Sequence, residues 1–280
     1  MQFFDSFKST INQSLEPLKG HTIIIKREDL IHPIVSGNKF RKLKYVFKSL
    51  EEKSDTTILT FGGAFSNHLA AVAAAGKLAD IKTIGIVRGE EWENKIEAST
   101  TLSYSKSQGM ELFCVSRADY DLKEGSGVVR DLQTQNPSTR ILPEGGTGTL
   151  GVKGCEEILQ KSDTEFDVIC SSVGTGGSAP NQTIIGFNAL KNPAVKNQIG
   201  QFTQKQNWNI EDRYVFGGYA KVNDDLISFM NSFYQQYKIP LDPIYTGKLL
   251  FGIFDIIKQN KWQWGKKILI IHTGGLQGVK

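Results

Sequence analysis

The sequence has few cysteines and no long apolar run. Only three cysteines occur in 280 residues, at positions 114, 155 and 170. They are isolated, odd in number and without the spacing of metal ligands, so we expect a reduced, cytoplasmic protein without a metal site. No apolar stretch reaches membrane-spanning length, and residues 1–19 are too polar for a signal peptide. We therefore expect no membrane partner.

The chain also has little net charge. Lys and Arg number 33 and Asp and Glu 29, which gives a net charge of +4. The densest basic run contains Lys39, Arg41, Lys42, Lys44 and Lys48. A nucleic-acid surface needs a broader basic face with aromatic side chains for stacking. We therefore predict no nucleic-acid partner, and a helix whose cationic face is solvated, with Lys39 as the exception.

Apolar, β-branched runs alternate with glycine-rich turns and with amphipathic or Ala-rich stretches. This alternation predicts an α/β fold in which helices cover both faces of a parallel sheet. The predicted strands are residues 56–61, 82–87, 111–115, 167–173, 183–187, 214–217 and 267–272. Ligands of such sheets bind at the carboxyl ends of the strands. The glycine-rich turns at 36–39, 62–68, 174–178 and 272–275 are therefore where chemistry is expected.

The first of these turns carries a lysine at the start of a predicted helix. Ser36 is a typical N-cap residue, and the apolar residues 40, 43, 47 and 50 share one helical face. Lys39 then lies in the first turn, where the helix dipole and burial both disfavour a charged ammonium. A lysine of lowered pKa is what imine formation with an aldehyde requires. The alternative is a surface lysine that follows an N-cap.

Several segments together resemble one enzyme family. The matching segments are residues 26–30, 36–43, 62–63 with 66–68, 143–146, 174–178, 241–248 and 272–275. In this order they resemble the aminocyclopropane-carboxylate deaminase / D-cysteine desulfhydrase family, which belongs to the tryptophan-synthase β-like, fold type II pyridoxal-phosphate enzymes. The resemblance covers nearly the whole chain, and it argues against the interpretation of Lys39 as a surface lysine.

The resemblance implies an architecture. We expect two open, mainly parallel sheets flanked by helices, with pyridoxal 5'-phosphate in the cleft between a large and a small domain. The large domain would comprise residues 1–42 plus 149–280 and the small domain residues 43–148. A homodimer is the family expectation.

The resemblance also implies roles for single residues. Lys39 would hold the cofactor as an imine and later shuttle the α-proton of the substrate, with Ser66 and Tyr245 as further catalytic residues. Asn67 would bond the ring oxygen of the cofactor, and Thr273 would offer a neutral hydroxyl to its ring nitrogen, which suits elimination better than transamination. The phosphate would be cradled by Gly174, Thr175, Gly176, Gly177 and Ser178. The substrate would meet Ser66, Asn67, His68, Tyr219 and Tyr245.

The leading hypothesis is a lyase or deaminase that acts on a small D-amino acid of the D-cysteine type. It would remove the α-proton, eliminate a β-substituent and release a keto acid and ammonia. Ring opening of aminocyclopropane carboxylate is the alternative within the family, but Thr246 stands where the ring-opening enzymes carry glutamate. Phe65 stands where family members usually carry glutamine. This difference puts in doubt the polarity of the substrate-pocket wall next to Ser66. A catalytically weak relative or a nucleotide-binding module is the remaining alternative, although nucleotide fingerprints are absent.

One connection is too short for the predicted fold. Strands 167–173 and 183–187 should be parallel neighbours, yet only residues 174–182 join them, whereas a parallel crossover needs roughly a dozen residues or more. Either a stretch of chain is unresolved there, or the crossover is lost. We favour the former, which predicts a gap near residues 178–180 that exceeds the ~3.8 Å between bonded Cα atoms.

Overall fold

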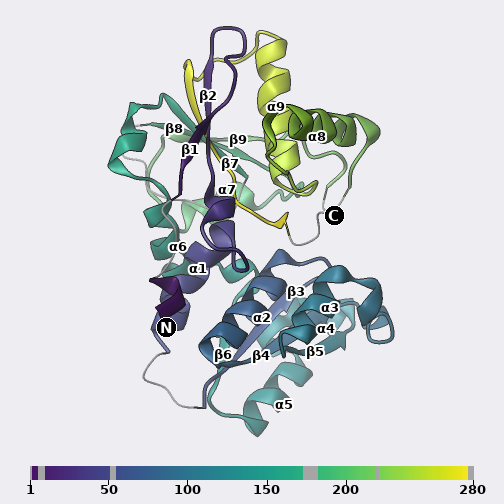
Figure 1. Ribbon diagram of the computed structural model, residues 1–280. Coiled ribbons are helices and arrows are strands. Elements are labelled where there is room, and N and C mark those ends of the chain that lie inside the picture. The colour runs from purple at the N-terminus through teal and green to yellow at the C-terminus, as the bar shows by residue number, and fades with distance from the viewer. Residues whose placement is uncertain (1, 6–9, 51–54, 173–181, 219–220, 277–280) are drawn as a thin grey trace.

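The structure is a computed structural model (Figure 1). It describes all residues except 1, 6–9, 51–54, 173–181, 219–220 and 277–280. The described strands are β1 Asn12–Ser14, β2 Thr22–Lys26, β3 Thr57–Gly62, β4 Lys82–Arg88, β5 Glu111–Val115, β6 Thr139–Leu142, β7 Val168–Ser172, β8 Thr183–Phe187, β9 Trp208–Glu211 and β10 Lys267–Ile271. The described α-helices are α1 Gly37–Lys48, α2 Asn67–Ala79, α3 Thr100–Ser107, α4 Arg117–Leu122, α5 Gly127–Gln135, α6 Thr149–Cys155, α7 Val195–Gly200, α8 Asp224–Tyr237 and α9 Thr246–Lys258. The short 3-10 turns are η1 Gln2–Phe4, η2 Glu28–Leu30, η3 Glu90–Trp92, η4 Ile96–Ala98, η5 Lys123–Gly125, η6 Glu144–Gly146, η7 Glu156–Ile158 and η8 Lys161–Glu165.

The strands form two open sheets in two lobes, which confirms the predicted fold class (Figure 1). The larger sheet has the order β1-β2-β10-β7-β8-β9, in which β1 is antiparallel to β2 and the other neighbours are parallel. The smaller sheet has the order β5-β4-β3-β6 and is parallel throughout. Both sheets therefore direct the carboxyl ends of their parallel strands to one edge, where ligands bind in such folds.

Helices cover both faces of the smaller sheet. Ile58 and Val87 pack with residues of α2 and α3, while Leu59 and Ile86 pack with residues of α4 and α5. Because successive side chains of a strand point to opposite faces, β3 is buried along its whole length. The parallel sheet was predicted from the alternation of such apolar runs with glycine-rich turns and helical stretches.

The larger sheet is built in the same way. On one face Ile25 and Ile270 pack with α8 and α9, and on the other Ile169 and Leu269 pack against the end of α6. Helix α6 also crosses α1 closely, since a Cβ on Gly154 would lie 1.9 Å from the Arg41 carbonyl oxygen. The helix that carries Lys39 is thus fixed against the larger lobe through a glycine contact.

The domain boundaries stay a prediction. Strands β3 to β6 all come from the predicted small domain, and the remaining strands come from the predicted large domain. The predicted boundary at residues 42/43 falls inside α1, and the one at 148/149 falls at the start of α6.

The predicted strand at 214–217 is wrong. Phe216, Gly217 and Gly218 have positive φ angles of 50°, 90° and 115°, which an extended strand does not allow. The segment turns so that the carbonyls of Val215 and Gly218 accept hydrogen bonds from Lys248 Nζ, at 3.0 and 2.7 Å. The outer strand of the sheet is β9 instead.

Strands β7 and β8 are parallel neighbours, as predicted. Of the residues that join them, 173–181 lie outside the described residues, and so does the predicted gap at 178–180.

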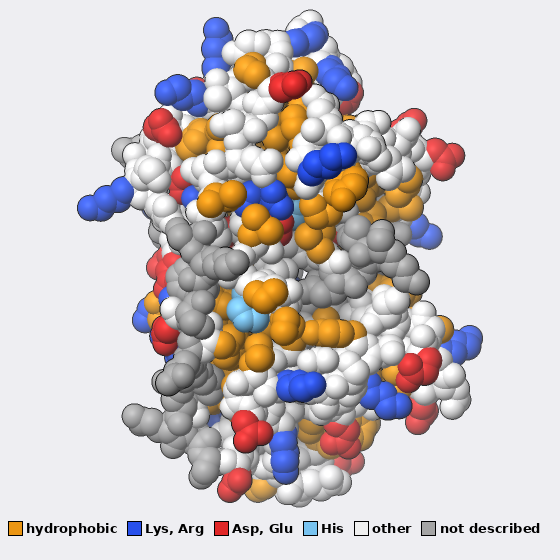
Figure 2. Space-filling view, viewed as in Figure 1, with side chains coloured by type: hydrophobic (Ala, Val, Ile, Leu, Met, Phe, Trp, Pro, Cys, Tyr) orange, Lys and Arg blue, Asp and Glu red, His pale blue; other side chains and the backbone are white. Residues whose placement is uncertain are grey.

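Among the described residues on the face in Figure 2, Lys and Arg side chains are scattered and interspersed with Asp and Glu. None of the described helices combines the length and apolar character needed to cross a membrane.

Candidate active site

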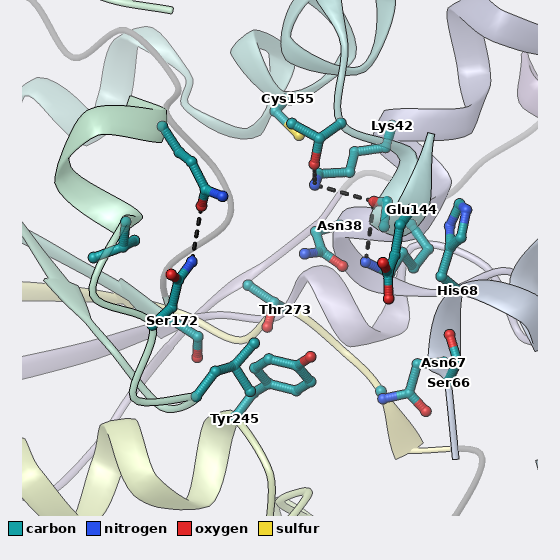
Figure 3. A pocket seen from close by; sticks show the side chains of 18 of the residues that line it. Asn38, Lys42, Ser66, Asn67, His68, Glu144, Cys155, Ser172, Tyr245 and Thr273 are labelled. Carbon is teal, nitrogen blue, oxygen red and sulfur yellow. Dashed lines mark hydrogen bonds between the residues drawn. The ribbon is translucent and has the colours of Figure 1, made fainter. Parts of the chain in front are cut away.

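A cavity of about 740 Å³ lies where strand ends of both sheets meet. Its walls include residues at or just beyond the carboxyl ends of β3, β4, β6, β7 and β10 (Figure 3). The structure brings together in it the predicted site residues Lys39, Ser66, Asn67, His68, Tyr245 and Thr273. The other predicted site residues, Gly174, Thr175, Gly176, Gly177, Ser178 and Tyr219, lie outside the described residues.

Two of the predicted glycine-rich turns touch at the cavity. The backbone N–H of Asn38 donates to the carbonyl oxygen of Thr273 at 3.1 Å. Gly37 has a φ of 61°, and a Cβ there would lie 1.9 Å from the same oxygen. Only glycine permits this contact, which fixes the start of α1 beside the end of β10.

Lys39 lies in the first turn of α1, half-buried. Its Nζ donates to the carbonyl oxygen of Gly145 at 3.4 Å, and Lys42 Nζ donates to the same oxygen at 3.2 Å. Burial, and next the neighbouring ammonium of Lys42, lower the pKa of Lys39 to about 7. The lowered pKa agrees with the prediction, with burial as the first cause and the ammonium of Lys42 as the second.

The predicted solvated cationic face of α1 is wrong for three of its members. Arg41, Lys42 and Lys44 are all buried. Arg41 pairs with Glu28 and Glu157, and Lys44 also pairs with Glu157. Lys42 lines the cavity and was missed as a site residue. Its partners come from distant parts of the chain, so local sequence offered no signal for its burial.

Ser66 and Asn67 form the start of α2. The Ser66 hydroxyl accepts a hydrogen bond from the backbone N–H of Leu69 at 3.3 Å, so Ser66 is the N-cap of α2. Ser66 also lines the cavity. Asn67 faces the turn after Thr273, because a Cβ on Gly275 would lie 2.7 Å from Asn67 Nδ2. The free N–H groups of the first helical turn point to this region and favour an anion.

His68 is a buried, neutral part of the wall. Its Nε2 lies 2.8 Å from the Thr60 hydroxyl, which donates its proton to the carbonyl of Leu142 at 2.8 Å. The histidine therefore carries its proton on Nε2. Burial, and then Lys39 and Lys42, hold the pKa of His68 well below its usual value. Its Nδ1 has no hydrogen-bond partner in the described part of the chain.

Tyr245 lines the cavity, whereas the next residue, Thr246, does not. Thr246 is fully buried, and its hydroxyl donates to Asp242 Oδ2 at 2.7 Å. Asp242 also accepts the backbone N–H groups of residues 244–246 and so fixes the turn that presents Tyr245. The hydroxyl of Thr246 is thus committed to the protein and not to a ligand.

The motif at 26–29 proves to be a set of buried ion pairs. Lys26 pairs with Asp163, Arg27 with Asp29, and Glu28 with Arg41. Asp29 in turn lies 3.6 Å from Nδ1 of His272, the residue before Thr273. These charges position α1 and the turn after β10 and do not line the cavity.

Residues 11–196 match the model of the family described as pyridoxal-phosphate dependent enzyme. The chain belongs to this family. It is therefore a pyridoxal-phosphate-dependent enzyme, and the expected cofactor is confirmed.

The chain is similar to relatives with two named activities. The chain is 29% identical to a putative 1-aminocyclopropane-1-carboxylate deaminase of Pyrococcus horikoshii, over 93% of this chain and 86% of the relative. It is 26% identical to a D-cysteine desulfhydrase of Klebsiella pneumoniae, over 91% and 87%. A crystal structure of an ACC deaminase homologue has the same fold, with a TM-score of 0.81, 24% identity, and coverage of 97% of this chain and 90% of that one.

The alignment with the Pyrococcus protein also contains internal gaps in the sequence of this enzyme. The alignment spans 291 positions, whereas 93% of the 280 residues of this enzyme is about 260 residues. About 30 residues of the relative are therefore aligned with gaps in this enzyme.

The cavity residues fit pyridoxal phosphate. Lys39 supplies an amine of lowered pKa, as capture of an aldehyde requires. Asn67 and Thr273 supply an amide and a neutral hydroxyl on the same wall. Ser172, the last residue of β7, also lines the cavity.

Proposed function

We propose that this enzyme is a lyase for small D-amino acids of the D-cysteine type, which releases a keto acid, ammonia and the β-substituent. The observation that carries the proposal is the low-pKa Lys39 in one cavity with Ser66, Asn67, Tyr245 and Thr273. Relatives named as D-cysteine desulfhydrase and 1-aminocyclopropane-1-carboxylate deaminase support it.

Lys39 would act twice. In the resting enzyme it would hold the cofactor aldehyde, and Asn67 and Thr273 would hold the ring oxygen and the ring nitrogen. The cofactor, when bound, supplies an electron sink for the negative charge that proton removal leaves on the substrate. When not bound to the cofactor, Lys39 would be a neutral base for the α-proton, because its lowered pKa disfavours protonation near pH 7.

The substrate would be oriented by the start of α2. Its carboxylate would meet the free N–H groups there, with Ser66 at its side. Tyr245 would face the β-substituent from the larger lobe, where Asp242 fixes its backbone. His68 would support this wall as a neutral ring beside Lys39 and Lys42.

We expect turnover of D-cysteine or β-chloro-D-alanine to exceed turnover of aminocyclopropane carboxylate. The hydroxyl of Thr246 is bound to Asp242, so this position offers no carboxylate to assist ring opening. A charged hydrogen-bond partner is worth on the order of 1.5–3 kcal/mol, or roughly 10- to 150-fold in kcat/KM. Release of sulfide or chloride measures turnover of D-cysteine or β-chloro-D-alanine, and keto-acid formation measures turnover of aminocyclopropane carboxylate. Equal or reversed values would favour the ring-opening alternative, and turnover of neither would favour a weak relative or, given Phe65, another substrate.

We expect capture of pyridoxal phosphate by the cofactor-free enzyme to accelerate as the pH rises toward 7. Only the neutral amine attacks an aldehyde, so the rate should rise about tenfold per pH unit below the pKa of Lys39, about 7, and level off above it. Stopped-flow absorbance of the yellow product measures the rate. A free amine in solution serves as control for titration of the cofactor itself. A profile still rising toward pH 10 would contradict a lowered pKa at Lys39.

We also propose a cytoplasmic homodimer. The cytoplasmic assignment is supported by the absence of disulfides among the described cysteines. Sedimentation at working concentration tests the dimer.

A further inference from the structure

Phe65 is a large apolar side chain that remains exposed at the cavity. It is 44% exposed and belongs to the cavity wall. Among the exposed large apolar side chains of the described residues, the other one in this wall is Phe202, which follows α7 in the larger lobe. A single exposed apolar residue is ordinary on a protein surface. Two aromatic rings that border one cavity instead supply apolar area for a ligand.

The ring of Phe65 is held in place by its surroundings. It lies in the turn 63–66, in which the N–H of the last residue donates to the carbonyl oxygen of the first at 3.0 Å. The buried hydroxyl of Ser99 donates to the carbonyl oxygen of Ala64, which fixes the same turn. Trp92 meets the Phe65 ring edge to face, with centroids 5.5 Å apart and an interplanar angle of 86°. Because the ring is positioned before a ligand arrives, a contact with it costs little additional ordering.

The position of Phe65 in the chain indicates which part of a ligand it would contact. Phe65 directly precedes Ser66, the N-cap of α2, and Ser66 lies next to Asn67 at the helix start where the substrate carboxylate would bind (Figure 3). A substrate anchored there has an aromatic ring beside its anchor. An apolar substituent that covers this ring removes apolar area from water, whereas the short thiol of cysteine covers little of it.

We propose that Phe65 selects substrates whose β-substituent carries an apolar group, such as an alkyl or benzyl thioether of D-cysteine. The inference rests on the proposed function and names its substrate class more closely. The reaction is the same elimination: the α-proton leaves, the Cβ–S bond breaks with its electron pair on sulfur, and the sulfur takes up a proton. With one water, S-benzyl-D-cysteine gives phenylmethanethiol, pyruvate and ammonium.

Substrate kinetics test the selection. The KM of the unaltered enzyme for S-benzyl-D-cysteine should be about 10-fold below its KM for D-cysteine. Phe65→Gln replaces the ring with a polar side chain and should remove most of this difference, through KM and not through kcat. Phe65→Leu keeps part of the apolar area and should reduce the difference only about 3-fold. Pyruvate formation measures both substrates.

An inert analogue tests binding without turnover. In D-2-amino-5-phenylpentanoate a CH2 group replaces the sulfur of S-benzyl-D-cysteine, so the compound has no leaving group. Equilibrium dialysis against the unaltered enzyme should give a Kd about 10-fold or more below that of D-alanine, because the phenyl group covers the Phe65 ring. Phe65→Gln should raise the Kd of the phenyl compound about 10-fold.

Leu78→Gln is the matched control. Leu78 is 43% exposed near the end of α2 and does not line the cavity. Its replacement should leave the KM difference and the Kd unchanged. If Phe65→Gln behaved like Leu78→Gln while D-cysteine was turned over, Phe65 would not contact the substrate, and the inference would be wrong although the proposed function held. Turnover of neither D-cysteine nor its benzyl thioether would reject the proposed function, and the inference with it.

Discussion

The Lys39→Ala variant is expected to retain no covalently bound cofactor and to lose turnover by on the order of 10³-fold or more. Lys39 is the amine that would hold the aldehyde and the base that would take the α-proton, so its removal affects both steps. The half-buried side chain touches the chain through one hydrogen bond to Gly145, at 3.4 Å, so the fold should persist. Borohydride reduction followed by peptide mapping locates the label in the unaltered enzyme.

Two other lysines make this test demanding. Lys42 reaches the same carbonyl of Gly145 and has a pKa lowered by burial, so it is the natural competitor for the label. Lys248 is fully buried, but its three N–H groups donate to the carbonyls of Ala189, Val215 and Gly218. Lys48→Ala, at the end of the same helix, is the control and should keep both label and turnover. Label on Lys42 or Lys248 would reject the assignment.

The meeting of distant motifs was predictable from the sequence. Residues 36–39 and 272–275 are two of the glycine-rich turns at which chemistry was predicted, and the parallel-sheet rule places such turns at one edge. The contact between Asn38 and Thr273 is the outcome. Strands β5 and β8 were predicted at their observed bounds, because each is an apolar run flanked by polar or glycine-rich residues.

Features that depend on tertiary contacts were not predictable. Strand β1 is Asn-Gln-Ser, and its only strand signal is pairing with β2. The burial of Lys42 depends on Gly145 and Thr147, more than a hundred residues away.

The largest expected effect on stability concerns Arg41, two residues after Lys39. Its guanidinium binds both oxygens of the fully buried Glu28, at 2.9 and 3.0 Å, and so ties α1 to the segment that follows β2. Arg41→Met would leave Glu28 buried without its ion partner, which should cost roughly 3–5 kcal/mol of unfolding free energy. Because α1 carries Lys39, cofactor affinity should fall as well. Urea unfolding and cofactor dialysis measure the two losses.

Two matched variants separate the ion pair from simple loss of a side chain. The double variant Glu28→Leu with Arg41→Met removes both charges, and it should recover most of the lost stability because an apolar pair often replaces a buried ion pair at little cost. Arg117→Met breaks an exposed pair with Glu91 and should change stability by less than about 1 kcal/mol. If Arg41→Met were no worse than Arg117→Met, the Glu28 pair would not anchor α1. If the double variant recovered stability but not cofactor affinity, the guanidinium would be needed to position Lys39, beyond its effect on folding.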